Sequence, residues 1–132
     1  MSEKKKILIV EDDAKILKAL TIRLKAEGYD VLGATDGMSG TAMARKEQPD
    51  LLLLDISMPA GGGFGVAQNV GNMSPLTGTP MVFMTASKQP GLKDQAEKLG
   101  AAGFIEKPFD TDTLLTTIRD ALSQEAGNEL PW

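Results

Sequence analysis

The stretch Leu51-Leu52-Leu53-Leu54-Asp55 decides the fold, because four consecutive leucines lead directly into a carboxylate. Taken alone, four leucines are compatible with a buried helix as well as with a strand. The run is short, however, and Pro49 and Pro59 lie on either side of it, which favours a strand. Continuous apolar character is typical of a parallel strand that is buried on both faces. We therefore predict such a strand over 51–54, with Asp55 at its carboxyl end.

Short apolar runs and helical patterns alternate along the rest of the chain. Ile7–Val10 is a second continuous run, and an amphipathic stretch that follows it ends near Gly28. Asp36 and Asp110 stand where they can cap later helices, and 60–65 is a glycine-rich loop. We predict strands over 7–10, 29–34, 51–54, 81–84 and 103–106, helices that end near 28, 47, 72, 99 and 122, and a frayed tail over 123–132.

Five successive strand–helix units predict an α/β fold. Parallel strands joined by right-handed crossovers form a doubly wound sheet with helices on both faces. The 132 residues show no repeat and no linker, so we expect a single domain over 1–132 with its core at about 5–122. A free-standing domain and part of a longer protein are both compatible with this pattern. The pattern alone does not give the order of the strands.

The composition restricts the chemistry that this chain can perform. It contains neither cysteine nor histidine, which excludes disulfides, thiol nucleophiles and histidine-based catalysis. A formal net charge of −4 disfavours binding to nucleic acid. No apolar run approaches the length of a membrane span, and the run after Lys4–Lys6 is too short for a signal peptide. We therefore predict a cytoplasmic protein that binds neither nucleic acid nor membranes.

Polar and charged side chains follow four of the five predicted strands, and in doubly wound folds these positions form the ligand site. Carboxylates about 4 Å apart repel by roughly 4 kcal/mol at an effective dielectric of about 20, so a cluster of them favours a hard cation such as Mg²⁺. A lysine and a hydroxyl suit phosphate oxygens, and an aspartate beside a metal can attack phosphorus. The side chains are Glu11, Asp12 and Asp13 after the first strand, Asp55 after the third, Thr85 after the fourth and Lys107 after the fifth.

Four motifs carry a resemblance to a known family. They are ILIVEDD from Ile7, LLLLDISMP from Leu51, MVFMTA from Met81 and FIEKPF from Phe104. Each motif is common by itself, whereas all four in this order and at this spacing are specific. Over about 5–122 the sequence resembles the receiver domains of response regulators in two-component signalling. The resemblance implies a flavodoxin-like (βα)5 fold with strand order 2-1-3-4-5, and a signalling phosphoacceptor rather than an enzyme.

The resemblance also assigns roles to the polar residues. It implies that Mg²⁺ or Mn²⁺ is the cofactor and that Asp55 accepts a phosphoryl group. The phosphoryl donor would be a sensor histidine kinase or a histidine phosphotransfer protein. The implied metal ligands are Asp12 directly, Glu11 through water, Asp55 itself and the backbone carbonyl of Ser57, while Thr85 and Lys107 contact the phosphoryl oxygens.

Two contact surfaces and a switch follow from the same resemblance. Phe104 occupies the family's switch position, and its ring is expected to become more buried when Thr85 moves inward. An output partner, or a second copy in a homodimer, would read the face formed by the predicted helix at 91–99, the strand at 103–106 and the last helix. The residues expected to contact the phosphoryl donor are Ala14, Lys15, Lys18, Pro108 and Phe109.

Several of these residues also have an interpretation without function. Asp13 is better explained as the cap of the first helix than as a ligand. Lys15 and Lys18 can be ordinary solvated charges, and Phe104 can be a core residue that never moves. The run Gly61–Gly63 lacks the Gly-Lys-Ser/Thr ending of a P-loop, so it is expected to be the loop after the phosphoacceptor.

Three functions stay open on the sequence alone. The first is a phosphorylated regulator, and the second is a receiver-like interaction module without phosphorylation, against which the complete set of polar residues argues. The third is an enzyme. A haloacid-type phosphatase would need an aspartate where Ser57 stands, and in a flavodoxin the carboxylates of 11–13 would repel the phosphate of FMN.

Overall fold

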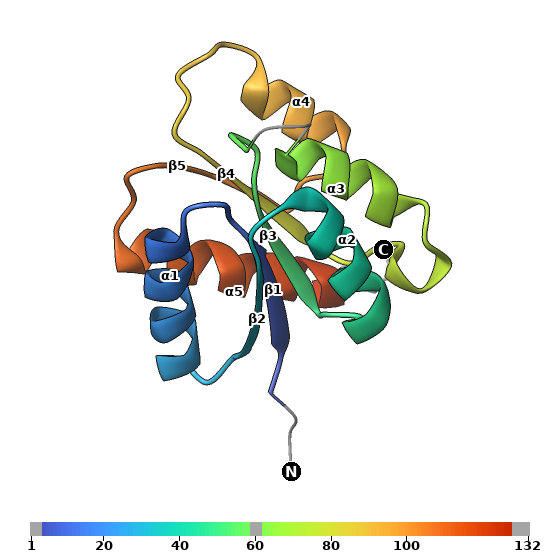
Figure 1. Cartoon of the computed structure of the whole chain (residues 1–132), viewed down its shortest axis with the longest axis horizontal. Helices are drawn as coiled ribbons and strands as arrows, with labels where there is room; N and C mark the ends of the chain where they lie inside the picture. The colour runs from blue at the N-terminus through green and yellow to red at the C-terminus, as the bar shows by residue number, and fades with distance from the viewer. Residues whose placement is uncertain (1–3, 59–61, 128–132) are drawn as a thin grey trace.

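The computed structural model describes residues 4–58 and 62–127, and its strands form one parallel sheet (Figure 1). The strands are β1 (Lys6–Val10), β2 (Asp30–Ala34), β3 (Leu51–Asp55), β4 (Met81–Thr85) and β5 (Gly103–Glu106). Their order in the sheet is β2-β1-β3-β4-β5. This order confirms the doubly wound, flavodoxin-like fold, and it places β1 beside β3 at the point where the chain reverses its direction across the sheet.

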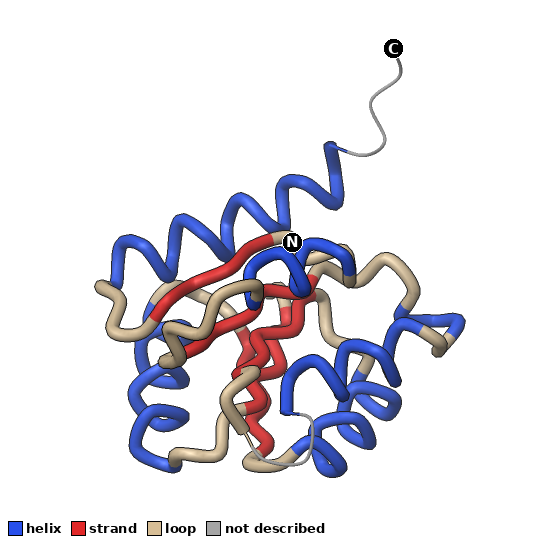
Figure 2. The backbone as a smooth tube through the Cα atoms, turned by 90° about the horizontal axis from the view of Figure 1, so that it is seen from above, coloured by secondary structure: helices blue, strands red, loops and turns tan. Residues whose placement is uncertain are grey.

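Helices cover both faces of the sheet (Figure 2). They are α1 (Ala14–Ala26), α2 (Gly37–Glu47), α3 (Gly62–Gly71), the short 3₁₀ helix η1 (Ser74–Leu76), α4 (Leu92–Lys98) and α5 (Thr111–Gly127). Apolar residues of α1 and α5 pack on one face, and those of α2, α3 and α4 pack on the other. Among the described residues, no helix is both long enough and apolar enough to cross a membrane.

The uninterrupted apolar strands are explained by these two helical layers. Along β1, Ile7 and Ile9 face the layer of α1 and α5, whereas Leu8 and Val10 face the layer of α2 and α3. All four leucines of β3 are fully buried in the same alternating way. Because side chains alternate along a strand, only a strand covered on both faces needs apolar residues at every position.

The predicted helix boundaries have clear local causes. The side chain of Asp36 accepts a hydrogen bond from the backbone N–H of Ser39, and Asp110 accepts one from the N–H of Thr113. These bonds satisfy donors that the first turn of a helix leaves unpaired. Gly28 follows α1 with a φ of 95°, a conformation that costs glycine little because it has no Cβ.

Two predicted boundaries are wrong. Helix α5 continues to Gly127, because the residues after Leu122 include good helix formers although the apolar pattern stops there. Helix α3 begins at Gly62, inside the predicted loop. A Cβ on Gly63 would lie 3.0 Å from the backbone oxygen of Asp55, so glycine here permits close packing of the helix against the end of β3. Pro59, Ala60, Gly61 and the tail over 128–132 lie outside the described residues.

Candidate functional site

Three predicted acidic residues meet at the carboxyl ends of β1 and β3. Glu11 and Asp12 follow β1, Asp55 ends β3, and one carboxylate oxygen of each lies within 4.8 Å of the others. They meet because β1 and β3 are adjacent and parallel, so both strands end at the same edge of the sheet. Glu11 and Asp55 are buried, with 1% and 2% of their surface exposed, whereas Asp12 is exposed. Three clustered carboxylate oxygens are the donor set that suits a hard divalent cation.

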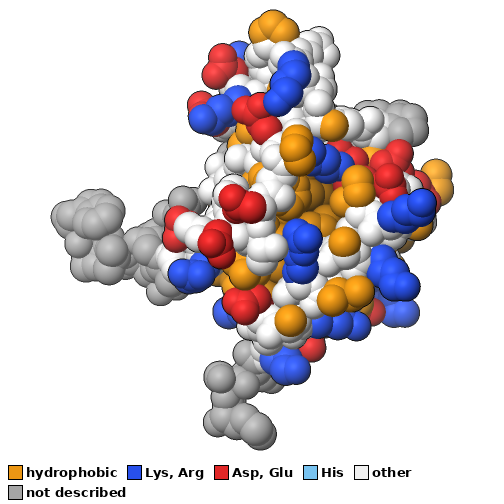
Figure 3. All heavy atoms as spheres, turned by 90° about the vertical axis from the view of Figure 1, so that its left-hand side faces the viewer, with side chains coloured by type: hydrophobic (Ala, Val, Ile, Leu, Met, Phe, Trp, Pro, Cys, Tyr) orange, Lys and Arg blue, Asp and Glu red, His pale blue; other side chains and the backbone are white. Residues whose placement is uncertain are grey.

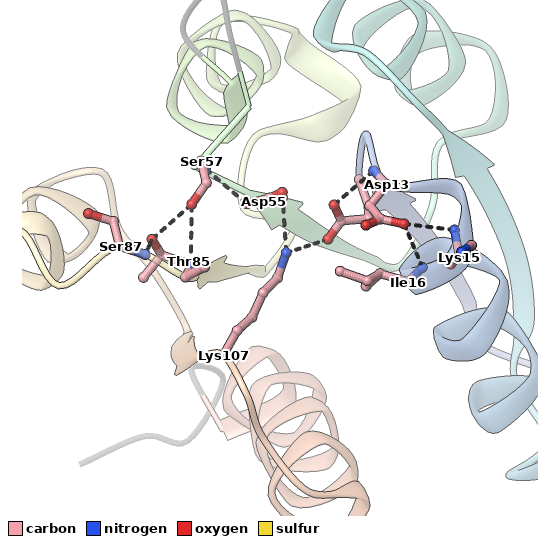
Figure 4. Close-up of polar contacts among 10 residues, drawn as sticks. Asp13, Lys15, Ile16, Asp55, Ser57, Thr85, Ser87 and Lys107 are labelled. Atoms are coloured by element: carbon pink, nitrogen blue, oxygen red, sulfur yellow. Dashed lines mark hydrogen bonds and ion pairs between the residues drawn. The ribbon is translucent and has the colours of Figure 1, made fainter.

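The ammonium group of Lys107 lies between the two buried carboxylates (Figure 4). Its Nζ is 2.6 Å from Oε1 of Glu11 and 3.3 Å from Oδ2 of Asp55. Burial lowers the pKa of Lys107, but the carboxylates of Glu11 and Asp55 together outweigh it, so its pKa is raised. Lys107 therefore stays charged and compensates part of the buried negative charge.

Burial changes the acidity of Glu11. It raises the pKa of this carboxyl group from 4.5 to about 7, and the neighbouring Asp55 acts in the same direction. Hydrogen bonds from Lys107 and from the backbone N–H of Asp13 oppose the shift. The acidic cluster therefore resists full ionisation near neutral pH, and a divalent cation would favour the ionised form.

A second group of contacts lies on the other side of Asp55. The backbone N–H of Ser57 donates to Oδ1 of Asp55 at 2.8 Å, and the hydroxyl groups of Ser57 and Thr85 are 3.0 Å apart. Thr85 Oγ1 also accepts from the backbone N–H of Ser87 at 2.9 Å, and Ser57 Oγ accepts from that of Ala86 at 3.3 Å. Ser57 thus connects Asp55 to Thr85 (Figure 4).

The hydroxyl group of Ser57 was missed by the sequence analysis, which assigned a role to its backbone carbonyl. A usable signal exists, because β3 is expected beside β4 and Ser57 comes two residues after the end of β3. The pairing of Asp55 with Met84 brings the residues beyond both strand ends together.

Asp13 caps α1, as predicted. Its Oδ1 accepts from the backbone N–H groups of Lys15 at 2.9 Å and Ile16 at 3.3 Å. Its own N–H donates to Oε2 of Glu11, which helps to orient that carboxylate. Asp13 is absent from the cluster of possible metal ligands among the described residues.

The residues expected to contact a phosphoryl donor lie around this edge of the sheet. Ala14, Lys15 and Lys18 are exposed near the start of α1. Pro108 is exposed and follows a cis peptide bond, while Phe109 is half-buried against the core of the α1–α5 layer. On the side of the molecule that carries α1, hydrophobic side chains gather in the middle with lysine and arginine nearby (Figure 3).

Phe104 lies away from this surface. It lies opposite Phe83 in the register of β4 and β5, is half-buried, and packs against the core of the α2–α3–α4 layer. An intermediate exposure leaves room for a more buried position of the ring, so the expected movement stays a prediction.

The fold and the acidic edge of the sheet define a doubly wound, flavodoxin-like α/β protein. The family model described as the response regulator receiver domain matches residues 7–119. The chain therefore belongs to this family, which serves two-component signalling.

Individual relatives agree with this assignment. The chain is 38% identical over 117 residues to "DNA-binding dual master transcriptional regulator RpaA" of Synechocystis, covering 89% of this chain and 48% of that protein. It is 36% identical over 118 residues to "Protein PilH" of Pseudomonas aeruginosa, covering 89% of this chain and 98% of that protein. The chain spans about half the length of RpaA and of several other curated relatives that it matches.

Solved structures show the same fold. The chemotaxis protein CheY4 of Vibrio cholerae superposes with a TM-score of 0.85 at 32% identity, covering 90% of this chain and 99% of that one. A CheY-like receiver domain protein of Methanospirillum hungatei superposes with a TM-score of 0.87 at 28% identity, covering 96% and 99%.

Proposed function

We propose that this receiver domain takes a phosphoryl group onto Asp55 in a reaction that depends on Mg²⁺ or Mn²⁺, and that a sensor histidine kinase or a histidine phosphotransfer protein supplies it. The observation that carries this proposal is the position of Asp55. One of its oxygens belongs to the acidic cluster, and its Oδ2 lies 3.3 Å from the ammonium group of Lys107. A carboxylate that belongs to a cation site and also contacts a lysine is placed to react with phosphorus.

Each residue of the site contributes a distinct step. A carboxylate oxygen of Asp55 attacks phosphorus, the bond from phosphorus to the imidazole nitrogen of the donor breaks, and the electron pair stays on that nitrogen. Lys107 supplies positive charge to the phosphoryl oxygens, and the Thr85 hydroxyl donates to one of them. A divalent cation held by Asp12, Asp55, the Ser57 carbonyl and, through water, Glu11 would neutralise further charge on the phosphoryl group.

The phosphorylated domain passes its signal by protein–protein contact. Thr85 ends β4 and Phe104 lies on the adjacent β5. A movement of Thr85 can therefore change the position of Phe104 and the face formed by α4, β5 and α5. An output partner or a second copy of the chain would bind there. The acidic composition makes direct contact of this domain with nucleic acid unfavourable. We also propose that the protein is cytoplasmic, as its two-component partners would require.

The direct test is to incubate the protein with acetyl phosphate and Mg²⁺ and to measure its intact mass. We expect one added phosphoryl group, and we expect that none is added when EDTA is present from the start. Asp55→Asn keeps the shape of the side chain but removes the nucleophile, so this variant should gain none. Phosphorylation of Asp55→Asn at the wild-type yield would contradict the assignment of the acceptor.

A further inference from the structure

The hydroxyl group of Thr85 is held by two contacts in the structure. Its Oγ1 lies 3.0 Å from Oγ of Ser57 and accepts a hydrogen bond of 2.9 Å from the backbone N–H of Ser87. The Ser57 hydroxyl is held in turn by the backbone N–H of Ala86, at 3.3 Å. Thr85 itself is buried, so the packing around it leaves few other orientations for its side chain.

These contacts oppose the movement that the proposed function needs. To donate to a phosphoryl group on Asp55, the Thr85 hydroxyl has to direct its single proton at that group. Where Thr85 is the donor to Ser57, this proton has to leave Ser57; where Ser57 is the donor, the contact opposes an inward shift of the Thr85 oxygen. In both cases the contact with Ser57 favours the resting orientation of Thr85.

We propose that the Ser57 hydroxyl is a positioning group that holds Thr85 in its resting orientation and so sets how easily the domain responds to phosphorylation. This inference rests on the proposed function, because it assumes that Thr85 moves toward a phosphoryl group on Asp55. It adds a role for the side chain of Ser57, which is separate from the expected role of its backbone carbonyl at the metal.

The geometry allows these two roles to be separated experimentally. Ser57→Ala removes the hydroxyl group but keeps the backbone N–H that donates to Asp55 and keeps the backbone carbonyl. Ser57 is exposed, so water can satisfy the N–H of Ala86 in the variant. Ser57→Thr restores a hydroxyl group at the same position and serves as the rescue variant.

Ser87→Ala is the matched control. Ser87 is exposed like Ser57, and its Oγ accepts from the backbone N–H of Gln89 at 3.1 Å. Among the contacts of the described residues, its hydroxyl group does not bond to Thr85, which Ser87 holds through its backbone. Removing this hydroxyl group therefore deletes a nearby serine side chain without deleting the contact in question.

The experiment measures the affinity of the Mg²⁺-loaded protein for beryllium trifluoride, a mimic of the phosphoryl group, together with the NMR signals of Thr85 in the protein without it. Ser57→Ala should bind the mimic roughly two- to fivefold more tightly, because one weak neutral hydrogen bond no longer has to break. The resting signals of Thr85 should move toward those of the mimic-bound wild type. Ser57→Thr should restore the wild-type affinity and signals because it returns the hydroxyl group, and Ser87→Ala should resemble the wild type in both measurements.

Two results would overturn the inference. Unchanged affinity and unchanged Thr85 signals in Ser57→Ala would show that the hydroxyl group does not hold Thr85. Weaker binding of the mimic would show that the hydroxyl group contacts the bound anion instead. A wild-type protein that binds no mimic and takes no phosphoryl group from acetyl phosphate would instead contradict the proposed function itself, so the two failures are distinguishable.

Discussion

The two sides of Asp55 are built on different physical principles. The acidic side, formed by Glu11 and Asp12 beside β1, gathers negative charge, and burial there raises the pKa of Glu11 to about 7. The hydroxyl side, formed by Ser57 and Thr85, is neutral, and its polar atoms are joined by hydrogen bonds between 2.8 and 3.3 Å. Lys107, which directly follows β5, reaches the acidic side.

In the proposed function, this difference separates the binding of a cation from the response to phosphorylation. On the acidic side, the energy depends on charge and therefore on pH and on cations. On the hydroxyl side, it depends on which hydrogen bonds are formed, and these differ between orientations of a single side chain. Asp55 belongs to both sides, so a phosphoryl group on it would change the charge of one and the hydrogen bonds of the other.

The largest expected effect comes from removing a proposed metal ligand on the acidic side. Asp12→Ala should reduce Mg²⁺-dependent phosphorylation of Asp55 by roughly 100-fold, because a bound metal supplies several kcal/mol of charge stabilisation. Asp13→Ala should keep most of the activity, since Asp13 caps α1 and lies outside the cluster of possible ligands among the described residues. Phosphorylation measured by intact mass over a Mg²⁺ titration checks both variants, and the reverse ranking would contradict the placement of the two aspartates.

The next effect should appear on the hydroxyl side. Thr85→Ala should still be phosphorylated, since Asp55 and the acidic cluster are unchanged, but its conformational response should weaken by roughly tenfold. The reason is the loss of a hydrogen bond to a charged group, which contributes about 1.5–3 kcal/mol. NMR of a labelled Phe104 ring, with and without the phosphoryl mimic, measures the response. An unchanged Phe104 environment in the wild-type protein would rule out this switch.

The fold could be predicted from the sequence wherever one face or both faces of an element are buried. The continuous apolar runs predicted β1 and β3, because strands covered on two faces need them. The order of the strands came from the family resemblance, since hydrophobic pattern carries no information on which strands are neighbours. The predicted end of α5 is wrong, because the helix continues past Leu122 into residues that show no apolar pattern.

The candidate site could be predicted as a set of residues but not as an arrangement. Strand ends indicated which side chains meet, yet Glu11 is buried while the adjacent Asp12 is exposed. That difference depends on packing against neighbouring strands and on Lys107, which is 96 positions away from Glu11 in the sequence. The contact between Ser57 and Thr85 depends on the orientations of two small side chains, and no sequence pattern encodes those.

A smaller effect concerns the stability of the acidic side without metal. Because the pKa of Glu11 is raised from 4.5 to about 7 on folding, its stability contribution is complete below 4.5 and is lost as the pH rises through 7. Relative to Glu11→Gln, the wild type should therefore lose about 1–2 kcal/mol between pH 5.5 and pH 8 in EDTA. Thermal unfolding of both proteins checks this, with Glu97→Gln on the exposed surface of α4 as the control for losing one carboxylate. Parallel pH profiles for wild type and Glu11→Gln would contradict the prediction.

The smallest expected effect lies on the surface next to the acidic side, where α1 begins. Lys15 and Lys18 are exposed there, and reversing both charges (Lys15→Glu with Lys18→Glu) should slow phosphotransfer from a cognate phosphohistidine protein severalfold, because rim charges act mainly on association. Acetyl phosphate is too small to touch this surface, so its rate with the variant should match that of the wild type. Rapid-quench phosphotransfer with both donors, at low and high salt, separates the two cases. Equal slowing with both donors would mean that the substitutions disturb the acidic side through α1 and not a docking surface. An unchanged rate with the protein donor would show that the two lysines are ordinary solvated charges.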